Sequence, residues 1–217
     1  MYQSSLFNFG HYIATSASQV AINRISTSWP WYVIRGAGFL AAALLILLMI
    51  SGIGQVTGII YRYIEPVKVW AIHKAMAIAL LIAIAIHIGF LLIDHFVSFN
   101  LVQILVPFAS HYSNGTKLFG LPLGAIAVTM GVLAMYGAII LVASSLGWID
   151  SRKTTWRKLH YISYAVILLV FLHALYAGSD LKYGIFRAGW IFLSLLLLVA
   201  IVVRLWRAGT LKRGRKD

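Results

Sequence analysis

The chain has 217 residues, of which 61% are hydrophobic and 11% are charged, and its formal net charge is +13. Soluble domains carry about 25% charged residues, so this composition excludes an ordinary soluble protein. The sequence contains no cysteine, which excludes disulfides, Fe–S clusters and thiolate metal sites.

Residues 1–30 form the first predicted segment. Apolar side chains recur in it about every 3.5 residues, which predicts a helix with one apolar stripe. The stripe consists of Leu6, Phe9, Ile13, Ala17 and Val20. We expect this amphipathic helix to lie along the outer membrane interface without crossing the membrane. The aromatic residues 29–32, with Pro30 among them, are typical of a membrane boundary and a helix start.

Five apolar runs follow, each close to the roughly 20 residues that a helix needs to cross a bilayer core of about 30 Å. Four of them hold no Lys, Arg, Asp or Glu, and the fifth reaches a full span if the arginines at its ends extend to the interface. The runs are 36–60, 75–93, 118–149, 159–179 and 188–203. They predict an all-α membrane protein with five transmembrane helices in one bundle over residues 31–207, followed by a basic tail at 208–217.

Lys and Arg residues are distributed unevenly over the loops. If the loops alternate between the two sides, segments 61–74, 150–158 and 204–217 share one side and hold 13 of the 18 Lys and Arg residues. By the positive-inside rule this side is cytoplasmic, so we expect the N-terminus outside and the C-terminus inside. Either topology alone or the docking of an acidic partner explains the basic tail. The positive charge follows the loops in this way and does not indicate nucleic acid.

Two of the apolar runs carry two histidines each. His73 and His87 are 14 residues apart, and His160 and His173 are 13 residues apart. An imidazole in hydrocarbon is costly without a partner, so such histidines mark candidate functional sites. On an ideal helix the first two lie about 40° apart and the second two about 140° apart. We therefore predict a local wide turn between His160 and His173 that brings both onto one face, and no distortion between His73 and His87.

The expected topology pairs these histidines by depth. Both helices run from inside to outside, which puts His73 with His160 near the cytoplasmic face and His87 with His173 near the outer face. Each pair can hold one heme iron from opposite sides through neutral imidazole nitrogens. The sequence therefore predicts two stacked b-type hemes that form an electron path through the bilayer. A shared zinc ion is excluded, because the two histidines of each helix differ in height by about 20 Å.

Three other groups of residues allow two interpretations each. Basic residues near the histidines are explained by topology, or equally well as partners of heme propionates: Arg35 outside, and Arg62, Lys68, Lys74, Arg157 and Lys158 inside. The three outer histidines are His11, His95 and His111. Either they are ordinary interfacial residues, or His95 with Asp94, together with His111, forms an outer acceptor or metal site. Small residues of the first span, among them Gly36, Gly38, Ser51, Gly52 and Gly54, allow close helix packing, whereas Gly124, Gly131 and Gly137 in the third span face either a flat cofactor or a neighbouring helix.

Three segments resemble the ferric reductase-like transmembrane domain, which is shared by ferric reductases, NADPH oxidases and the heme-binding membrane subunit of the periplasmic methionine sulfoxide reductase system. They read WYVIRGAGFLAAALLILL, IHKAMAIALLIAIAIH and WRKLHYISYAVILLVFLHALYAGSD. The resemblance spans residues 31–207. It implies a transmembrane electron relay with a cytoplasmic His73/His160 heme and an outer His87/His173 heme.

We expect the chain to depart from the oxidases and the large ferric reductases in having no flavin or NAD(P)H domain after the fifth helix and no extra N-terminal helix. The resemblance therefore implies the electron-transfer subunit of an oxidoreductase with two heme b groups. We expect a separate flavoprotein or quinol as donor, with a flavin supplied by that partner as a further cofactor. We expect a protein or small molecule as the outer acceptor, and a multi-pass location in a prokaryotic cell (inner) membrane.

Two alternatives stay open. One is a quinol-oxidising cytochrome b subunit, whose helices also carry histidine pairs about this far apart; the small residues at 177–180 favour the ferric reductase-like interpretation over it. The other is a heme-free membrane interaction or assembly protein, in which the histidines pack or relay protons. A b-type absorption band in the reduced protein separates both redox interpretations from the heme-free one.

Overall fold

The computed structural model describes the backbone of residues 2–118 and 120–213, and the side chains of residue 19 and of residues 28–118 and 120–206. The long helices are α1 (Tyr2–Thr57), α2 (Pro66–Ile93), α4 (Leu123–Trp148), α5 (Lys153–His160), α6 (Ile162–Ala177) and α7 (Gly184–Arg213). In the described part of the chain, five stretches are long and apolar enough to cross a membrane: Ser28–Thr57, Pro66–Ile93, Leu123–Trp148, Lys153–Ala177 and Gly184–Trp206. In hydrocarbon every backbone polar group must be bonded internally, so runs of this composition fold as helices. The predicted all-α architecture with five spans is confirmed.

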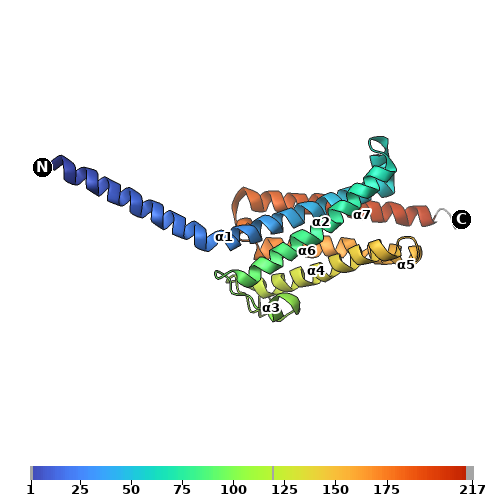
Figure 1. The fold of residues 1–217 in the computed structure, drawn as a ribbon. Helices are drawn as coiled ribbons and strands as arrows, with labels where there is room; N and C mark the ends of the chain where they lie inside the picture. The colour runs from blue at the N-terminus through green and yellow to red at the C-terminus, as the bar shows by residue number, and fades with distance from the viewer. Residues whose placement is uncertain (1, 119, 214–217) are drawn as a thin grey trace.

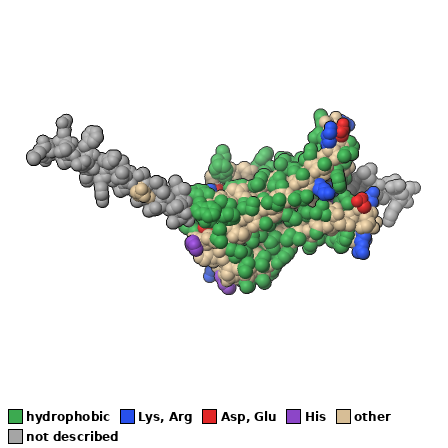
Figure 2. Space-filling model, viewed as in Figure 1, with side chains coloured by type: hydrophobic (Ala, Val, Ile, Leu, Met, Phe, Trp, Pro, Cys, Tyr) green, Lys and Arg blue, Asp and Glu red, His purple; other side chains and the backbone are tan. Residues whose placement is uncertain are grey.

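Helices α1, α2, α4 and α6 run alongside one another and form a bundle, and α7 packs on α6 (Figure 1). The core between them contains Leu45 of α1, Leu80 of α2, Ile167 of α6 and Leu197 of α7. Large apolar side chains also cover the outside of the bundle (Figure 2). An apolar exterior of this extent faces lipid in a membrane protein.

Helix α1 differs from the prediction. We expected a separate interfacial helix over residues 1–30, but one helix runs from Tyr2 through Pro30 to Thr57. A proline inside a helix removes one backbone hydrogen bond, which bends a helix without having to end it. The part of α1 before Pro30 projects beyond the bundle (Figure 1). Its apolar stripe and His11 lie outside the described side chains, and the interfacial position of this segment stays a prediction.

The longest connection joins α2 to α4 at the end of the bundle from which α1 projects (Figure 1). It contains α3 (Leu101–Leu105) and the antiparallel strands β1 (Lys117–Leu118) and β2 (Leu121–Pro122). The hydroxyl of Thr129 in α4 accepts the N–H of Phe108 at 3.0 Å, and the side-chain amide of Asn114 donates to the carbonyl of Tyr176 at 3.1 Å. These bonds hold the connection across this end of the bundle. At the other end, the 3₁₀ turn η1 (Ile59–Arg62) links α1 to α2.

The span with His160 and His173 is interrupted at Tyr161. Helix α5 ends at His160, and α6 begins at Ile162. The N–H of Tyr161 donates to the carbonyl of Lys158 at 3.3 Å, three residues back, which is the bonding of a tight 3₁₀ turn. The span with His73 and His87 is one continuous helix. A distortion is therefore present where one was predicted, but the prediction of a wide turn is wrong.

The rotation from His160 to His173 on an ideal helix explains this correction. It falls about 140° short of four full turns. A tight turn adds about 20° of rotation per residue and brings the two side chains closer to one face, whereas a wide turn removes rotation.

Candidate functional site

Two cavities lie inside the bundle, one toward each end. The cavity of about 330 Å³ beneath the long connection is lined by both His87 and His173, and we call it the outer cavity after the predicted topology. The other cavity, of about 610 Å³, is lined by both His73 and His160, and we call it the inner cavity for the same reason. Four apolar side chains line both cavities and form a wall between them, one from each helix of the bundle: Leu45, Leu80, Ala138 and Val166. The structure thus brings the four histidines together two by two.

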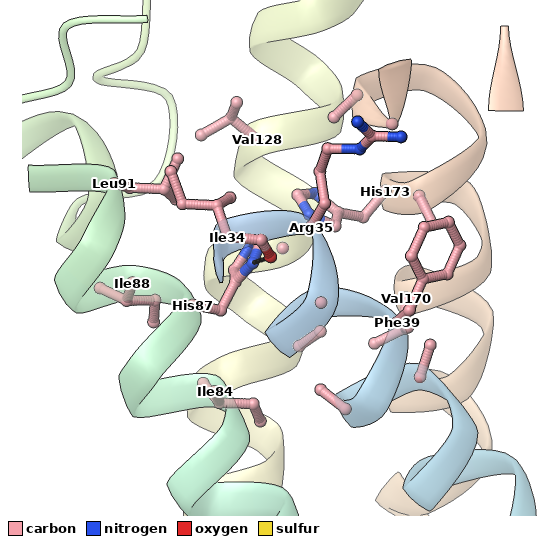
Figure 3. Close-up of a pocket in the computed structure, with 18 of the residues that line it drawn as sticks. Ile34, Arg35, Phe39, Ile84, His87, Ile88, Leu91, Val128, Val170 and His173 are labelled. Carbon is pink, nitrogen blue, oxygen red and sulfur yellow. Dashed lines mark hydrogen bonds between the residues drawn. The ribbon is translucent and has the colours of Figure 1, made fainter. Parts of the chain in front are cut away.

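His87 of α2 and His173 of α6 both lie in the outer cavity (Figure 3). Their ring centres are 6.4 Å apart, and the ring planes are 87° to one another. Nδ1 of His87 lies 2.8 Å from the carbonyl oxygen of Ile34, and Nδ1 of His173 lies 2.8 Å from that of Ala127. A carbonyl oxygen only accepts hydrogen bonds, so Nδ1 carries the proton in both rings. Nε2 therefore keeps its lone pair for a metal ion.

A glycine on the neighbouring helix gives each of these two rings the space to reach its carbonyl. A Cβ atom on Gly38 of α1 would lie 3.1 Å from Nδ1 of His87, and one on Gly131 of α4 would lie 2.6 Å from Nδ1 of His173. Each glycine comes four residues after the carbonyl that its histidine contacts, and in an α-helix a carbonyl points toward that fourth residue. Gly38 and Gly131 therefore position the two rings, a role that sequence reasoning missed.

The two histidines of the inner cavity are held differently. Nδ1 of His73 lies 2.7 Å from Oγ of Ser51, and that hydroxyl donates its single hydrogen to the carbonyl of Leu48 at 3.0 Å. Oγ must then accept from Nδ1 of His73, which again leaves Nε2 free. Nδ1 of His160 is buried and has no hydrogen-bond partner among the described residues. The indole of Trp156 lies beside this ring, with 5.2 Å between ring centres.

Arg35 was predicted as a propionate partner on the outer side, and it lines the outer cavity. Its guanidinium donates two hydrogen bonds to the carboxylate of Asp180, one from Nε at 2.6 Å and one from Nη2. It also lies 4.0 Å from the ring centre of Trp31. Because Asp180 already balances its charge, Arg35 connects α1 to the turn η2 (Ser179–Leu181) at the rim of this cavity.

The other basic residues predicted as propionate partners separate into two groups. Lys74 and Arg157 are exposed and line the inner cavity. Arg62, Lys68 and Lys158 lie outside both cavity linings.

The residues predicted for an outer acceptor or metal site do not come together. The carboxylate of Asp94 is buried in the lining of the outer cavity, where it accepts the N–H of Val97 at 3.0 Å. His95 and His111 are exposed and lie outside that lining. Within the residues that the structure describes, no group of three or more His, Asp or Glu side chains could hold a metal ion.

Arg204 of α7 lines the inner cavity, and sequence reasoning missed it as a site residue. Its guanidinium donates to the hydroxyl of Tyr164 in α6, and its Nε is buried without a partner among the described residues. The only signal in the sequence was an arginine at the end of the last apolar run, and membrane topology explained that position.

A bundle of membrane-length helices around two cavities, each containing two histidines, defines a multi-pass helical membrane protein with two candidate cofactor sites. The model of the family described as "Ferric reductase like transmembrane component" matches residues 37–171, more than half of the chain. The chain therefore belongs to this family, and the resemblance inferred from the sequence is confirmed. The matched region includes His73, His87 and His160 and ends just before His173. No curated protein and no solved structure matches the chain.

Proposed function

We propose that this protein is a diheme b-type cytochrome that conducts electrons across the membrane. The observation that carries the proposal is the distance of 6.4 Å between the ring centres of His87 and His173. Metal–imidazole bonds are about 2 Å long and the ring centre lies about 1 Å from the nitrogen, so two imidazoles on opposite sides of one metal ion have centres about 6 Å apart. The spacing in the outer cavity therefore fits two axial ligands of one heme iron.

The chemistry of the surrounding residues supports the same assignment. Three of the four histidines, His73, His87 and His173, donate a hydrogen bond from Nδ1, which leaves the neutral Nε2 that iron requires. His73 and His160 would hold the inner heme, and His87 and His173 the outer one. When bound, hemes with two histidine ligands supply one-electron transfer. The four apolar wall residues line both sites, so the two hemes would be neighbours.

We further propose that electrons pass from a cytoplasmic-side donor to an outer-side acceptor. The distribution of Lys and Arg over the loops supports this orientation in a cell membrane. A separate flavoprotein or quinol is the expected donor, and a protein or small molecule is the expected acceptor. At the rim of the inner cavity, Lys74 lies 5.3 Å from the ring centre of Trp70, and Arg157 is exposed nearby in the lining. These cations would attract an acidic donor or the phosphate of a partner's flavin.

The test is the absorption spectrum and heme content of the full chain, produced with adequate heme and purified in mild detergent. We expect a b-type α band on reduction with dithionite, two hemes per chain, and no spectral change with carbon monoxide. A protein without heme would refute the proposal.

Alanine variants of the four histidines test the pairing. His87→Ala and His173→Ala should lose the same heme, and His73→Ala and His160→Ala should lose the other. The matched control is His95→Ala, because His95 is exposed outside both cavity linings and should leave two hemes. If His73→Ala and His160→Ala disturb different hemes, the pairing is wrong.

A further inference from the structure

Two residues that line the inner cavity each have one buried polar atom without a hydrogen-bond partner among the described residues, Nδ1 of His160 and Nε of Arg204. A buried donor without a partner is unfavourable, and more so when the group is charged. His160 has a role as a proposed axial ligand, whereas Arg204 has none in the proposed function. Arg204 lines the cavity and forms no ion pair with a described residue, which indicates that the cavity receives a further hydrogen-bond acceptor.

Arg204 is held in place by α6. Its guanidinium donates to the hydroxyl oxygen of Tyr164 and lies 5.7 Å from the centre of that ring. Because the hydroxyl oxygen accepts this bond, its own hydrogen remains available to donate to a third group. A guanidinium and a hydroxyl that both offer hydrogens match a carboxylate, which only accepts.

No acidic side chain forms an ion pair with Arg204 within the part of the chain that the structure describes. Asp150, the acidic residue in the same lining, is exposed. Arg204 lies two residues before the end of the span Gly184–Trp206, where a guanidinium can extend to the interface, yet its side chain is half-buried and forms no ion pair with a described residue. An anionic partner supplied by a bound molecule resolves this conflict.

We propose that Arg204 and Tyr164 form a carboxylate-binding site in the inner cavity, and that the carboxylate is a propionate of the inner heme. This inference rests on the proposed function. Lys74 and Arg157 line the same cavity, but both are exposed, so water screens their charges. Arg204 is half-buried, and its charge therefore acts more strongly on the cavity. Helix α7, which supplies no axial ligand, thereby contributes to the inner site.

The proposal predicts the direction of a redox change. Reduction adds a negative charge to the heme, so a nearby cation favours the reduced form. Replacing Arg204 with glutamine should therefore lower the midpoint potential of the inner heme and leave that of the outer heme unchanged. Arg204→Lys keeps the charge without the planar guanidinium and should produce a smaller shift.

The experiment is a potentiometric titration of both hemes in the full-length protein, followed by their b-type absorbance. Arg204→Gln is compared with Arg62→Gln, which removes one exposed cation outside both cavity linings and should shift neither potential. Repeating Arg204→Gln in the His87→Ala background identifies the affected heme, since only the inner heme should remain there. Tyr164→Phe, which removes one hydroxyl, should lower the same potential by a smaller amount, and it provides the test if Arg204→Gln does not fold.

Each outcome has a distinct meaning. A lower potential for the inner heme alone, absent in Arg62→Gln, supports the site. Two hemes with potentials unchanged by Arg204→Gln, or changed equally by Arg62→Gln, would overturn the inference and leave the proposed function intact. A shift of the outer heme alone would also overturn it. A wild-type protein without heme would refute the proposed function and, with it, this site.

Discussion

Single hydrogen bonds orient three of the four histidines that line the cavities. Nδ1 of His87 and of His173 donates to a backbone carbonyl, and Nδ1 of His73 donates to the hydroxyl of Ser51. Partners of this kind orient a metal-binding ring and fix its tautomer, and their loss typically weakens metal binding about 10–100-fold. Nδ1 of His160 has no such partner among the described residues. His160 is therefore the ring whose tautomer no described residue fixes.

The substitution Gly131→Ala is expected to weaken binding of the outer heme about 10-fold or more. The new Cβ would lie 2.6 Å from Nδ1 and 2.7 Å from Cε1 of His173, so the ring must move away from its carbonyl. The measurement is the number of hemes per chain in protein produced with limiting heme. Gly147→Ala in the same helix is the matched control, because nothing lies within 4 Å of its new Cβ. Equal heme content in the two variants would contradict the positioning role of Gly131.

The interruption at Tyr161 changes the rotation between His160 and His173 about the axis of their span. Helix α2 needs no interruption, because 14 residues on an ideal helix leave His73 and His87 only about 40° apart. With 13 residues, the span of α5 and α6 has to gain rotation, and the tight turn after His160 provides some of it. The spacing of the histidines and the local geometry of the backbone are thus linked.

Changes in length at this turn test the link. Inserting one alanine after Tyr161 makes the spacing 14, as in α2, and we expect the variant to keep two hemes per chain. Deleting Ile162 makes the spacing 12 and removes about 100° of rotation, so we expect the inner heme to be lost because the short helix α5 moves more easily than the bundle. Heme content of the purified variants is the measurement. Loss of heme after the insertion, together with its retention after the deletion, would show that rotation is not the reason for the turn.

The two ends of the helix bundle differ in charge and in the segments that cover them. Most of the Lys and Arg side chains visible in Figure 2 gather at the end where η1 and α5 lie, and the long connection covers the opposite end. The two cavities extend from these ends toward a common wall of four apolar side chains. If the protein conducts electrons, the electron path runs between these two ends, and the loop charge sets which end faces the cytoplasm.

Reporter fusions test the orientation of the whole chain. Alkaline phosphatase fused to the C-terminus should be inactive, because this enzyme needs disulfides that form outside the cytoplasm. Green fluorescent protein at the same position should fluoresce. As the control, phosphatase fused after Asn100, in the long outer connection, should be active. An active phosphatase at the C-terminus would reverse the proposed orientation.

The sequence was sufficient for the membrane class, the five spans, the family and the candidate histidines. A bilayer leaves an apolar run of about 20 residues no alternative to a helix, so composition alone predicts the spans. The charge of the loops then predicts which histidines share a depth. The expectation of a separate first helix was wrong, because one helix runs through Pro30, although the first span begins at Ser28. The turn at Tyr161 was expected in the right span but in the wrong sense.

The tertiary structure alone decided which neighbour each of these residues contacts. In the structure, Gly38 and Gly131 lie beside the histidine rings, Arg35 pairs with Asp180, and Arg204 lines the inner cavity. These contacts depend on how each helix is rotated about its axis. In a soluble protein the division between polar and apolar faces reveals that rotation. In this chain the core and the lipid-facing surface are both apolar, so the sequence determines where each helix crosses, and only packing against its neighbours decides which way it faces.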